Sequence, residues 1–236
     1  MPERWLTLDN YGTLTNWLAG MRSALLHVGV AEERVDELLL AYHAQELTVE
    51  GLAGWIPYRE VLETGLARAA ELTGIALPAG GAAAFVERWD ELPIYPDVEA
   101  GLSALRDAGW KLVVLTNCDD DLWARTRAHI PVEFDDWITA EQVRSYKPDL
   151  AHFQEFRKRI ADDDLWVHAA TSWLHDIYPA ARMGVPRVWV DRDRTGHPPA
   201  FADRRIDDIA SLPATIAELL PQLQPASVPH VKSPLQ

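Results

Sequence analysis

The sequence predicts an α/β protein with a Rossmann-like parallel sheet core and an inserted helical cap domain. Two observations support this prediction. Short apolar runs that end in polar residues alternate with helix-like segments along most of the chain, an order typical of βαβ units. One stretch near the N-terminus has helical spacing almost throughout. We therefore expect a core from residues 1–15 and 93–220, a cap from residues 16–92, and an extended C-terminal tail from residues 221–236.

Four buried strands are expected in the core. Arg4–Leu8 is followed at once by Asp-Asn-Tyr-Gly-Thr, which favours a turn. Lys111–Leu115 follows a helix-like segment whose last residue, Gly109, favours a helix end. Two later strands also run into polar residues, and helices are expected around them: strands Trp166–Ala170 and Arg187–Val190, helices Asp149–Ile160 and Ile177–Met183. Parallel sheets bind ligands beyond the carboxyl ends of their strands, so we expect the polar residues there to converge.

The cap is expected to consist of four helices. Apolar residues recur there at three- and four-residue spacing in Met21–Val28, Val35–Leu47, Tyr58–Leu72 and Ala82–Asp90. Leu77–Gly81 is predicted as a turn, and Pro93 and Pro96 mark the return to the core. The tail from Pro221 onward contains four prolines and little apolar periodicity, which favours an extended segment.

Composition and charge narrow the classes of function. A chain of 236 residues with 48% hydrophobic content can bury a sizeable core. The single cysteine, Cys118, excludes an intramolecular disulfide framework. The formal charge of -14 argues against a nucleic-acid partner. The chain has no apolar run of roughly 18 residues, and its start lacks the apolar stretch of a signal peptide. We therefore expect a cytoplasmic protein that acts on a small molecule.

The residues after the first predicted strand, Asp9 to Thr15, read Asp-Asn-Tyr-Gly-Thr-Leu-Thr. A carboxylate fixed at a strand end is a competent nucleophile when neighbouring donors orient it, and Gly12 lets the backbone fold tightly around it. On its own, however, this fragment is better read as an aspartate that caps a turn before a helix. Three further groups follow in order: Thr116 and Asn117 after the second strand, Lys147 in Ser-Tyr-Lys-Pro-Asp, and Asp176.

These four motifs, in this order, resemble those of the haloacid dehalogenase superfamily. The resemblance implies a covalent mechanism in which Asp9 is the nucleophile. Thr13 and Thr116 are expected to donate hydrogen bonds to its carboxylate, and Lys147 to keep it ionised by direct charge stabilisation. Asp176 would help Lys147 to activate a water molecule. Alone, Lys147 would be read as a solvated loop lysine; the other motifs favour the catalytic interpretation.

Two positions favour carbon over phosphorus as the atom attacked. The phosphatase branch has a second aspartate where Tyr11 stands and a magnesium-binding acid where Ser172 stands. Without them phosphoryl transfer lacks its general acid and a metal ligand. Asp-x-Tyr-Gly-Thr resembles the metal-free L-2-haloacid dehalogenase branch, in which the aspartate attacks C2 with inversion. We expect no metal and no cofactor.

The substrate pocket departs from that branch. The cap segment Leu38–Leu47 has Tyr42 and His43 but lacks the arginine of that branch. Trp173 replaces an asparagine, and Phe153 replaces a tyrosine. The predicted substrate-binding residues are Asn10, Tyr11, His43, Thr116, Asn117, Ser172 and Trp173. Further lining candidates are His175, Trp17, Trp55 and Tyr58, although core packing is as good an interpretation of the aromatic residues. His175 is more simply read as a polar residue at a helix start than as a proton shuttle.

The leading functional hypothesis is hydrolytic dehalogenation of a short 2-haloacid, a small carboxylate. A second enzyme hypothesis is ring opening of azetidine-2-carboxylate or a related C–N substrate. A third is a magnesium phosphatase, which Tyr11 and Ser172 disfavour. A catalytically silent binding protein would have no chemical need of the residues Asp9, Thr13, Thr116, Lys147 and Asp176. The sequence leaves a homodimer open, and it does not select the leaving group, the chain length or the enantiomer.

Overall fold

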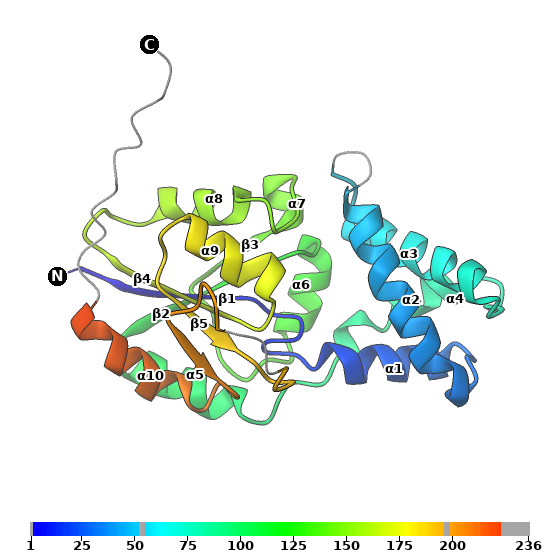
Figure 1. The fold of residues 1–236 in the computed structure, drawn as a ribbon, viewed down its shortest axis with the longest axis horizontal. Coiled ribbons are helices and arrows are strands. Elements are labelled where there is room, and N and C mark those ends of the chain that lie inside the picture. The colour runs from blue at the N-terminus through cyan, green and yellow to red at the C-terminus, as the bar shows by residue number, and fades with distance from the viewer. Residues whose placement is uncertain (1, 52–54, 196–198, 223–236) are drawn as a thin grey trace, which may run out of the picture.

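The structure, a computed structural model, describes residues 2–51, 55–195 and 199–222. An α/β core carries a separate bundle of helices at one end (Figure 1). Of the predicted tail, residues 223–236 lie outside the described residues, and Leu220–Gln222 forms a short 3-10 helix, η3. None of the helices in the described part of the chain has the length and apolar character that crossing a membrane requires.

The core contains a six-stranded sheet with strand order β3-β2-β1-β4-β5-β6, and all of its neighbouring strands are parallel. The strands are β1 (Arg4–Leu8), β2 (Trp110–Thr116), β3 (Asp136–Thr139), β4 (Leu165–Ala170), β5 (Arg187–Val190) and β6 (Arg204–Ile206). This confirms the predicted parallel α/β fold. The two outer strands, β3 and β6, were not predicted, because they are short and only Ile206 of β6 is buried.

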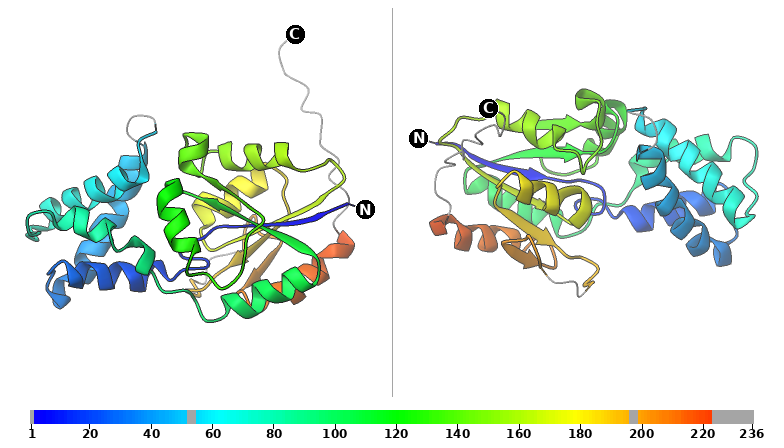
Figure 2. Two further views of the ribbon diagram at one scale, coloured as in Figure 1. Left: turned by 180° about the vertical axis from the view of Figure 1, so that it is seen from behind. Right: turned by 45° about the horizontal axis from the view of Figure 1, so that its top comes forward.

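Helices cover both faces of the sheet, which is why its central strands are apolar on both sides. On one face, α5 (Val98–Asp107) and α10 (Leu212–Leu219) pack against side chains such as Leu112 and Val114. On the other face, α8 (Ala151–Arg159) and α9 (Tyr178–Arg182) pack against Val113 and Leu115. Figure 2 shows the sheet between these two layers. Two further helices, α6 (Asp120–Arg127) and α7 (Ala140–Val143), precede and follow β3.

The register places the site. Leu8 of β1 pairs with Val114 of β2 and with Ala169 of β4. The C-terminal ends of β1, β2 and β4 therefore lie side by side at the carboxyl edge of the sheet. Because β1 is flanked by β2 and β4, Asp9, the residue that follows β1, lies between the segments that follow both neighbours.

The cap segment contains α1 (Trp17–His27), α2 (Glu32–Gly51), α3 (Tyr58–Thr73), α4 (Gly81–Val86) and the 3-10 turn η1 (Trp89–Glu91). The two segments that connect it to the core lie side by side, since Asn16 N donates to Pro93 O at 2.6 Å and Tyr95 N donates to Leu14 O at 3.0 Å. Asn16 also caps α1 through its side chain. At Gly20 a Cβ would lie 2.0 Å from the side chain of Leu92, so only glycine permits this close approach.

A core side chain binds the N-terminus of a helix in the cap domain. The carboxylate of Asp119, in the loop after β2, accepts hydrogen bonds from Tyr58 N at 2.8 Å and Arg59 N at 2.9 Å. These amides belong to the first turn of α3, where amide groups have no partner within the helix. The Tyr146 hydroxyl also donates to Ile56 O at 2.6 Å. The core therefore fixes the position of the cap above the carboxyl edge of the sheet.

Candidate active site

A cavity of about 560 Å³ lies between the cap and the carboxyl edge of the sheet. It is lined by residues from both parts. The core contributes Asp9, Tyr11, Gly12, Asn117, Lys147, Thr171, Ser172, His175, Asp176 and Asp193; the cap contributes Trp17, Leu18, Asp36, Leu39, Leu40, His43, Glu46, Glu50 and Tyr58. The convergence of residues from the ends of β1, β2 and β4 is the outcome expected for a parallel sheet.

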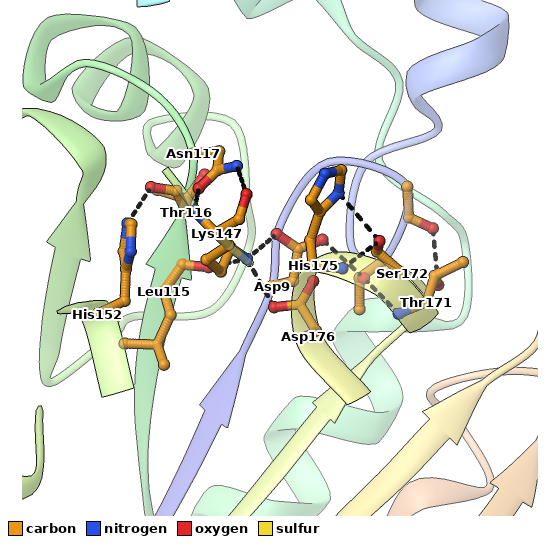
Figure 3. Close-up of polar contacts among 12 residues, drawn as sticks. Asp9, Leu115, Thr116, Asn117, Lys147, His152, Thr171, Ser172, His175 and Asp176 are labelled. Atoms are coloured by element: carbon orange, nitrogen blue, oxygen red, sulfur yellow. Dashed lines mark hydrogen bonds and ion pairs between the residues drawn. The ribbon is translucent and has the colours of Figure 1, made fainter. Parts of the chain in front are cut away.

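A tight turn after β1 orients Asp9. Gly12 has a φ of 88°, a conformation that favours glycine, and the Asn10 carbonyl accepts from the amides of Thr13, Leu14 and Thr15. The turn returns Thr13 to the start of the loop, where its hydroxyl donates to Asp9 Oδ2 at 3.0 Å. The amide of Thr171 in turn donates to Thr13 Oγ1 at 2.9 Å. The Asp9 carboxylate is thus oriented by Thr13, which is itself bound by the residue that follows the neighbouring strand β4 (Figure 3).

Lys147 lies between the two carboxylates. Its Nζ is 2.9 Å from Asp9 Oδ1, 2.6 Å from Asp176 Oδ1 and 2.8 Å from Leu115 O, so all three ammonium protons have acceptors. The side chain is 1% exposed. Asn117 fixes its backbone through two bonds, Asn117 Nδ2 to Lys147 O at 3.0 Å and Lys147 N to Asn117 Oδ1 at 2.7 Å.

The shared lysine acts unequally on the two acids. Burial favours the neutral form of Asp176, but the charge of Lys147 and hydrogen bonds from His168 and Lys147 hold its pKa at about 2. For Asp9, burial is the largest influence and raises the pKa, and Lys147 offsets only part of it. Burial favours neutral Lys147, but the carboxylates of Asp176 and Asp9 together raise its pKa. Lys147 is therefore a fixed cation, and Asp9 is the more readily protonated acid.

A buried chain of side chains behind Asp176 was not predicted from the sequence. His168 Nε2 lies 3.3 Å from Asp176 Oδ1, and Thr7 Oγ1 lies 2.9 Å from His168 Nδ1. The Trp166 indole donates to Thr7 Oγ1 at 2.8 Å. When Thr7 donates its proton to Nδ1, the ring proton is on Nε2, the nitrogen nearer to Asp176. A single histidine within an apolar strand was the only sequence signal for this contact.

The predicted substrate-binding residues fall into two groups. Tyr11, His43, Asn117 and Ser172 line the cavity. The Tyr11 hydroxyl is within 3.1 Å of Thr126 Oγ1, and its ring packs against Trp89. His43 lies 3.7 Å from Glu46 Oε2 on α2.

Asn10, Thr116 and Trp173 do not line the cavity. Asn10 is fully buried, and both polar atoms of its side chain lack a partner among the described residues. The Thr116 hydroxyl donates to Cys118 Sγ at 3.5 Å, and not to Asp9 as the sequence suggested, because strand alternation turns its side chain to the other face. Trp173 stacks on Tyr178 and donates to Ala200 O. Of the further candidates, Trp17, Tyr58 and His175 line the cavity and Trp55 does not.

The cap makes its side of the cavity acidic, which sequence reasoning missed. Glu46 accepts from the hydroxyls of Tyr58 at 2.6 Å and Tyr42 at 3.2 Å. Burial and the charge of Glu46 raise the pKa of Glu50 to about 9. Among the described lining residues Lys147 is the one lysine, and none is an arginine. Spacing along α2 indicates only that these glutamates share a face, because the groups opposite that face come from the core.

The donors present do not fit a magnesium ion. Magnesium prefers several carboxylate and water oxygens, but Asp9 and Asp176 are both paired with Lys147. Residues 171 and 172 supply hydroxyl groups in place of a third carboxylate. Within the described ranges, no group of three or more His, Cys, Asp or Glu side chains is placed to hold a metal ion.

Comparison with known proteins gives one consistent family. A family model described as haloacid dehalogenase-like hydrolase matches residues 4–165. The chain is 22% identical over 225 residues to (S)-2-haloacid dehalogenase 1 of Pseudomonas sp. (strain CBS-3), covering 92% of this chain and 98% of that protein. The crystal structure of the L-2-haloacid dehalogenase RSc1362 superposes with a TM-score of 0.78 at 19% identity, covering 92% of this chain and all of the other.

The same fold also accommodates a metal-bound relative. The HAD-hydrolase YfnB from Bacillus subtilis, in a structure bound to magnesium, superposes with a TM-score of 0.77 at 16% identity, covering 92% of this chain and all of the other. At these identities the structural comparisons show the shared fold. The chemistry must be argued from the residues of this chain.

Proposed function

The chain belongs to the haloacid dehalogenase-like hydrolases, and on that premise we propose that it hydrolyses the carbon–halogen bond of a short 2-haloacid, without a metal ion, through an ester of Asp9. One observation carries the proposal. The Asp9 carboxylate lines the cavity between core and cap while Lys147, in place of a metal ion, holds its charge. The relatives named as 2-haloacid dehalogenases support the choice of carbon as the atom attacked.

The chemistry proceeds in two displacements. In the first, a carboxylate oxygen of Asp9 attacks C2 of the substrate, and the halide leaves with the electron pair of the broken bond. The contacts to Thr13 and Lys147 orient the carboxylate for this attack. In the second, water attacks the ester carbonyl, which restores Asp9 and releases a 2-hydroxy acid. The cavity of about 560 Å³ accommodates an acid of this size.

The cap supplies a cationic group for the substrate carboxylate. The resemblance predicts an arginine on this helix, but the corresponding segment Leu38–Leu47 has Tyr42 and His43 and no arginine. A hydrogen bond to Glu46 raises the pKa of His43, so its imidazole carries more positive charge than an isolated one. Ser172 adds a hydroxyl from the core side.

The test is halide release from L- and D-2-chloropropionate, chloroacetate and fluoroacetate in the presence of EDTA. We expect release by the wild-type chain and none by Asp9→Asn. Asp162→Asn is the matched control, because that carboxylate is 94% exposed on the far loop after α8. Release that requires added magnesium, or that persists in Asp9→Asn, would contradict the proposal.

A second candidate is supported by the acidic cap. Glu46 and Glu50 line the cavity. Because its pKa is raised to about 9, Glu50 is neutral near pH 7, so Glu46 is the group that favours a substrate with an ammonium group over a simple anion. Azetidine-2-carboxylate carries both charges, and attack of Asp9 at C2 would release the ring nitrogen as an amine. Mass spectrometry of the products from azetidine-2-carboxylate and 2-chloropropionate, run in parallel, separates the two candidates.

The two remaining hypotheses have less support. Tyr11 offers no carboxylic acid to protonate a phosphate leaving group, and its hydroxyl already contacts Thr126. A silent binding protein would not need a fully buried Lys147 between two carboxylates, an arrangement that is costly to desolvate. Loss of all activity across the substrate panel, with and without magnesium, would favour the binding protein.

A further inference from the structure

We propose that His175 is the general base that deprotonates the water attacking the Asp9 ester, an inference that rests on the proposed hydrolysis. The resemblance assigns this task to Asp176 and Lys147, and His175 is more simply read from the sequence as a polar residue at a helix start. The geometry of the turn after β4 supports the catalytic role instead.

His175 lies on a single π-helical turn, η2 (Trp173–Ile177), that follows the end of β4. Ser172 caps this turn by accepting from His175 N at 3.1 Å, and its Oγ is also 3.1 Å from His175 Nδ1. Both contacts come from one hydroxyl, so the ring is fixed in position and orientation.

The second ring nitrogen of His175 is left without a partner beside the cavity. His175 and Asp9 line the same cavity, and His175 Nε2 is buried without a hydrogen-bond partner among the described residues. When the ring proton is on Nδ1, it is donated to Ser172 Oγ and the Nε2 lone pair is free. In the view of Figure 3, the His175 ring and the Asp176 carboxylate lie on opposite sides of the Asp9 carboxylate. The proposal places the attacking water in this cavity, between His175 Nε2 and the Asp9 ester.

Asp176 and Lys147 are poor bases in this arrangement. Asp176 Oδ1 is bound by Lys147 at 2.6 Å, and a carboxylate whose pKa is held at about 2 accepts a proton weakly. Its second oxygen has no partner among the described residues, but it shares the same delocalised charge. Lys147 is charged and has three acceptors. Neither group is suited to take a proton from water at neutral pH.

His175 has the opposite character. Burial lowers its pKa, so the ring is neutral near neutral pH. The charged and titratable groups around it are Asp176 on its own turn, Lys147 from the core loop, and Glu46 and His43 from α2 of the cap. Asp176 and Glu46 favour the charged ring, while Lys147 and His43 oppose it. The neutral form is the one that a general base requires.

Hydrolysis of the Asp9 ester requires one proton to leave water and one to reach the departing alkoxide. Water oxygen bonds to the carbonyl carbon of the Asp9 ester while one water proton moves to His175 Nε2. The bond between that carbon and the substrate oxygen then breaks, and the imidazolium returns its proton to the departing alkoxide. The product is a 2-hydroxy acid, and His175 regains its neutral ring. Asp9 is released as a carboxylic acid and becomes a carboxylate when it loses the remaining water proton to solvent.

The experiment compares His175→Gln with wild type and with the surface control His129→Gln, using 2-chloropropionate. We expect His175→Gln to release about one equivalent of halide at a rate near that of wild type, and then to stop. Steady-state turnover should fall by about a hundredfold or more. The ester should accumulate, and mass spectrometry of the peptide containing Asp9 should detect it. In wild type, decay of the ester should slow as the pH falls through the lowered pKa of His175, and in His175→Gln this dependence should be absent.

Three outcomes would overturn the inference. Turnover by His175→Gln with the pH profile of wild type would remove any role as base. Loss of the halide burst in a His175→Gln protein with native circular dichroism would place His175 before ester formation. Absence of any Asp9 ester in wild type would instead overturn the proposed function itself, and the inference with it.

Discussion

Lys147 Nζ lies 2.6 Å from Asp176 Oδ1 and somewhat farther, 2.9 Å, from Asp9 Oδ1. Lys147 is therefore bound more closely by Asp176, while it also contacts Asp9. Asp176 is fully buried, whereas Asp9 keeps a small exposed fraction toward the cavity. Asp176 thus serves mainly to fix the cation, and Asp9 remains the carboxylate that a substrate can reach.

Replacing Lys147 with methionine should destabilise the fold as well as abolish activity. The change leaves two buried carboxylates without their cation, and breaking a buried ion pair costs about 3–5 kcal/mol. Urea unfolding near neutral pH measures the change. Lys111→Met is the control, because its partner Glu3 is exposed and surface pairs contribute about 0–1 kcal/mol. Equal midpoints for the two variants would contradict the assignment.

The rate of ester formation should fall in acid before the protein unfolds. Burial raises the pKa of Asp9 above 3.8, and the nucleophile must be ionised, so the halide burst should weaken as the pH falls through this raised value. Asp176, with a pKa of about 2, contributes stability that is present above 3.8 and is lost only as the pH falls toward 2. Rapid-quench measurement of the burst, beside circular dichroism, separates the two effects. A burst that is unchanged down to the onset of unfolding would show that Asp9 titrates normally.

His168→Asn should lower stability and leave ester formation nearly intact. The shorter side chain cannot join Thr7 to Asp176, so buried polar groups lose partners at a cost of about 1–3 kcal/mol. Thermal unfolding measures the loss, and the exposed His27→Asn serves as control, with an expected change within about 0.5 kcal/mol. A halide burst reduced as strongly as in Lys147→Met would instead give His168 a direct part in the first step.

Glu50→Gln should stabilise the protein in alkaline solution. The folded-state pKa of Glu50 is raised from 4.5 to about 9, so its contribution to stability is fully present below 4.5 and is lost as the pH rises through 9. A glutamine does not titrate and escapes this loss. Urea midpoints measured across this range should diverge in favour of the variant as the pH rises. The exposed Glu60→Gln should follow wild type throughout, and a Glu50→Gln curve parallel to wild type would contradict the raised value.

The parallel fold and the convergence of Asp9, Lys147 and Asp176 followed from the sequence alone. Apolar runs that end in polar residues specify strands, and parallel topology brings the ends of those strands to one edge. The strands β3 and β6 were missed because short outer strands bury few residues and leave little pattern. Local sequence thus determined which residues stand at the edge of the sheet.

The tertiary structure decided which groups meet across that edge. Periodicity describes the faces of one element, but the contact of His168 with Asp176 and the turning of the Thr116 hydroxyl to Cys118 depend on neighbouring elements. The acidic lining by Glu46 and Glu50 exists only because α2 of the cap lies over the sheet. The sequence by itself determined the fold and the place of Asp9 at the end of the first strand; packing between distant segments determined the burial, partners and charge around Asp9.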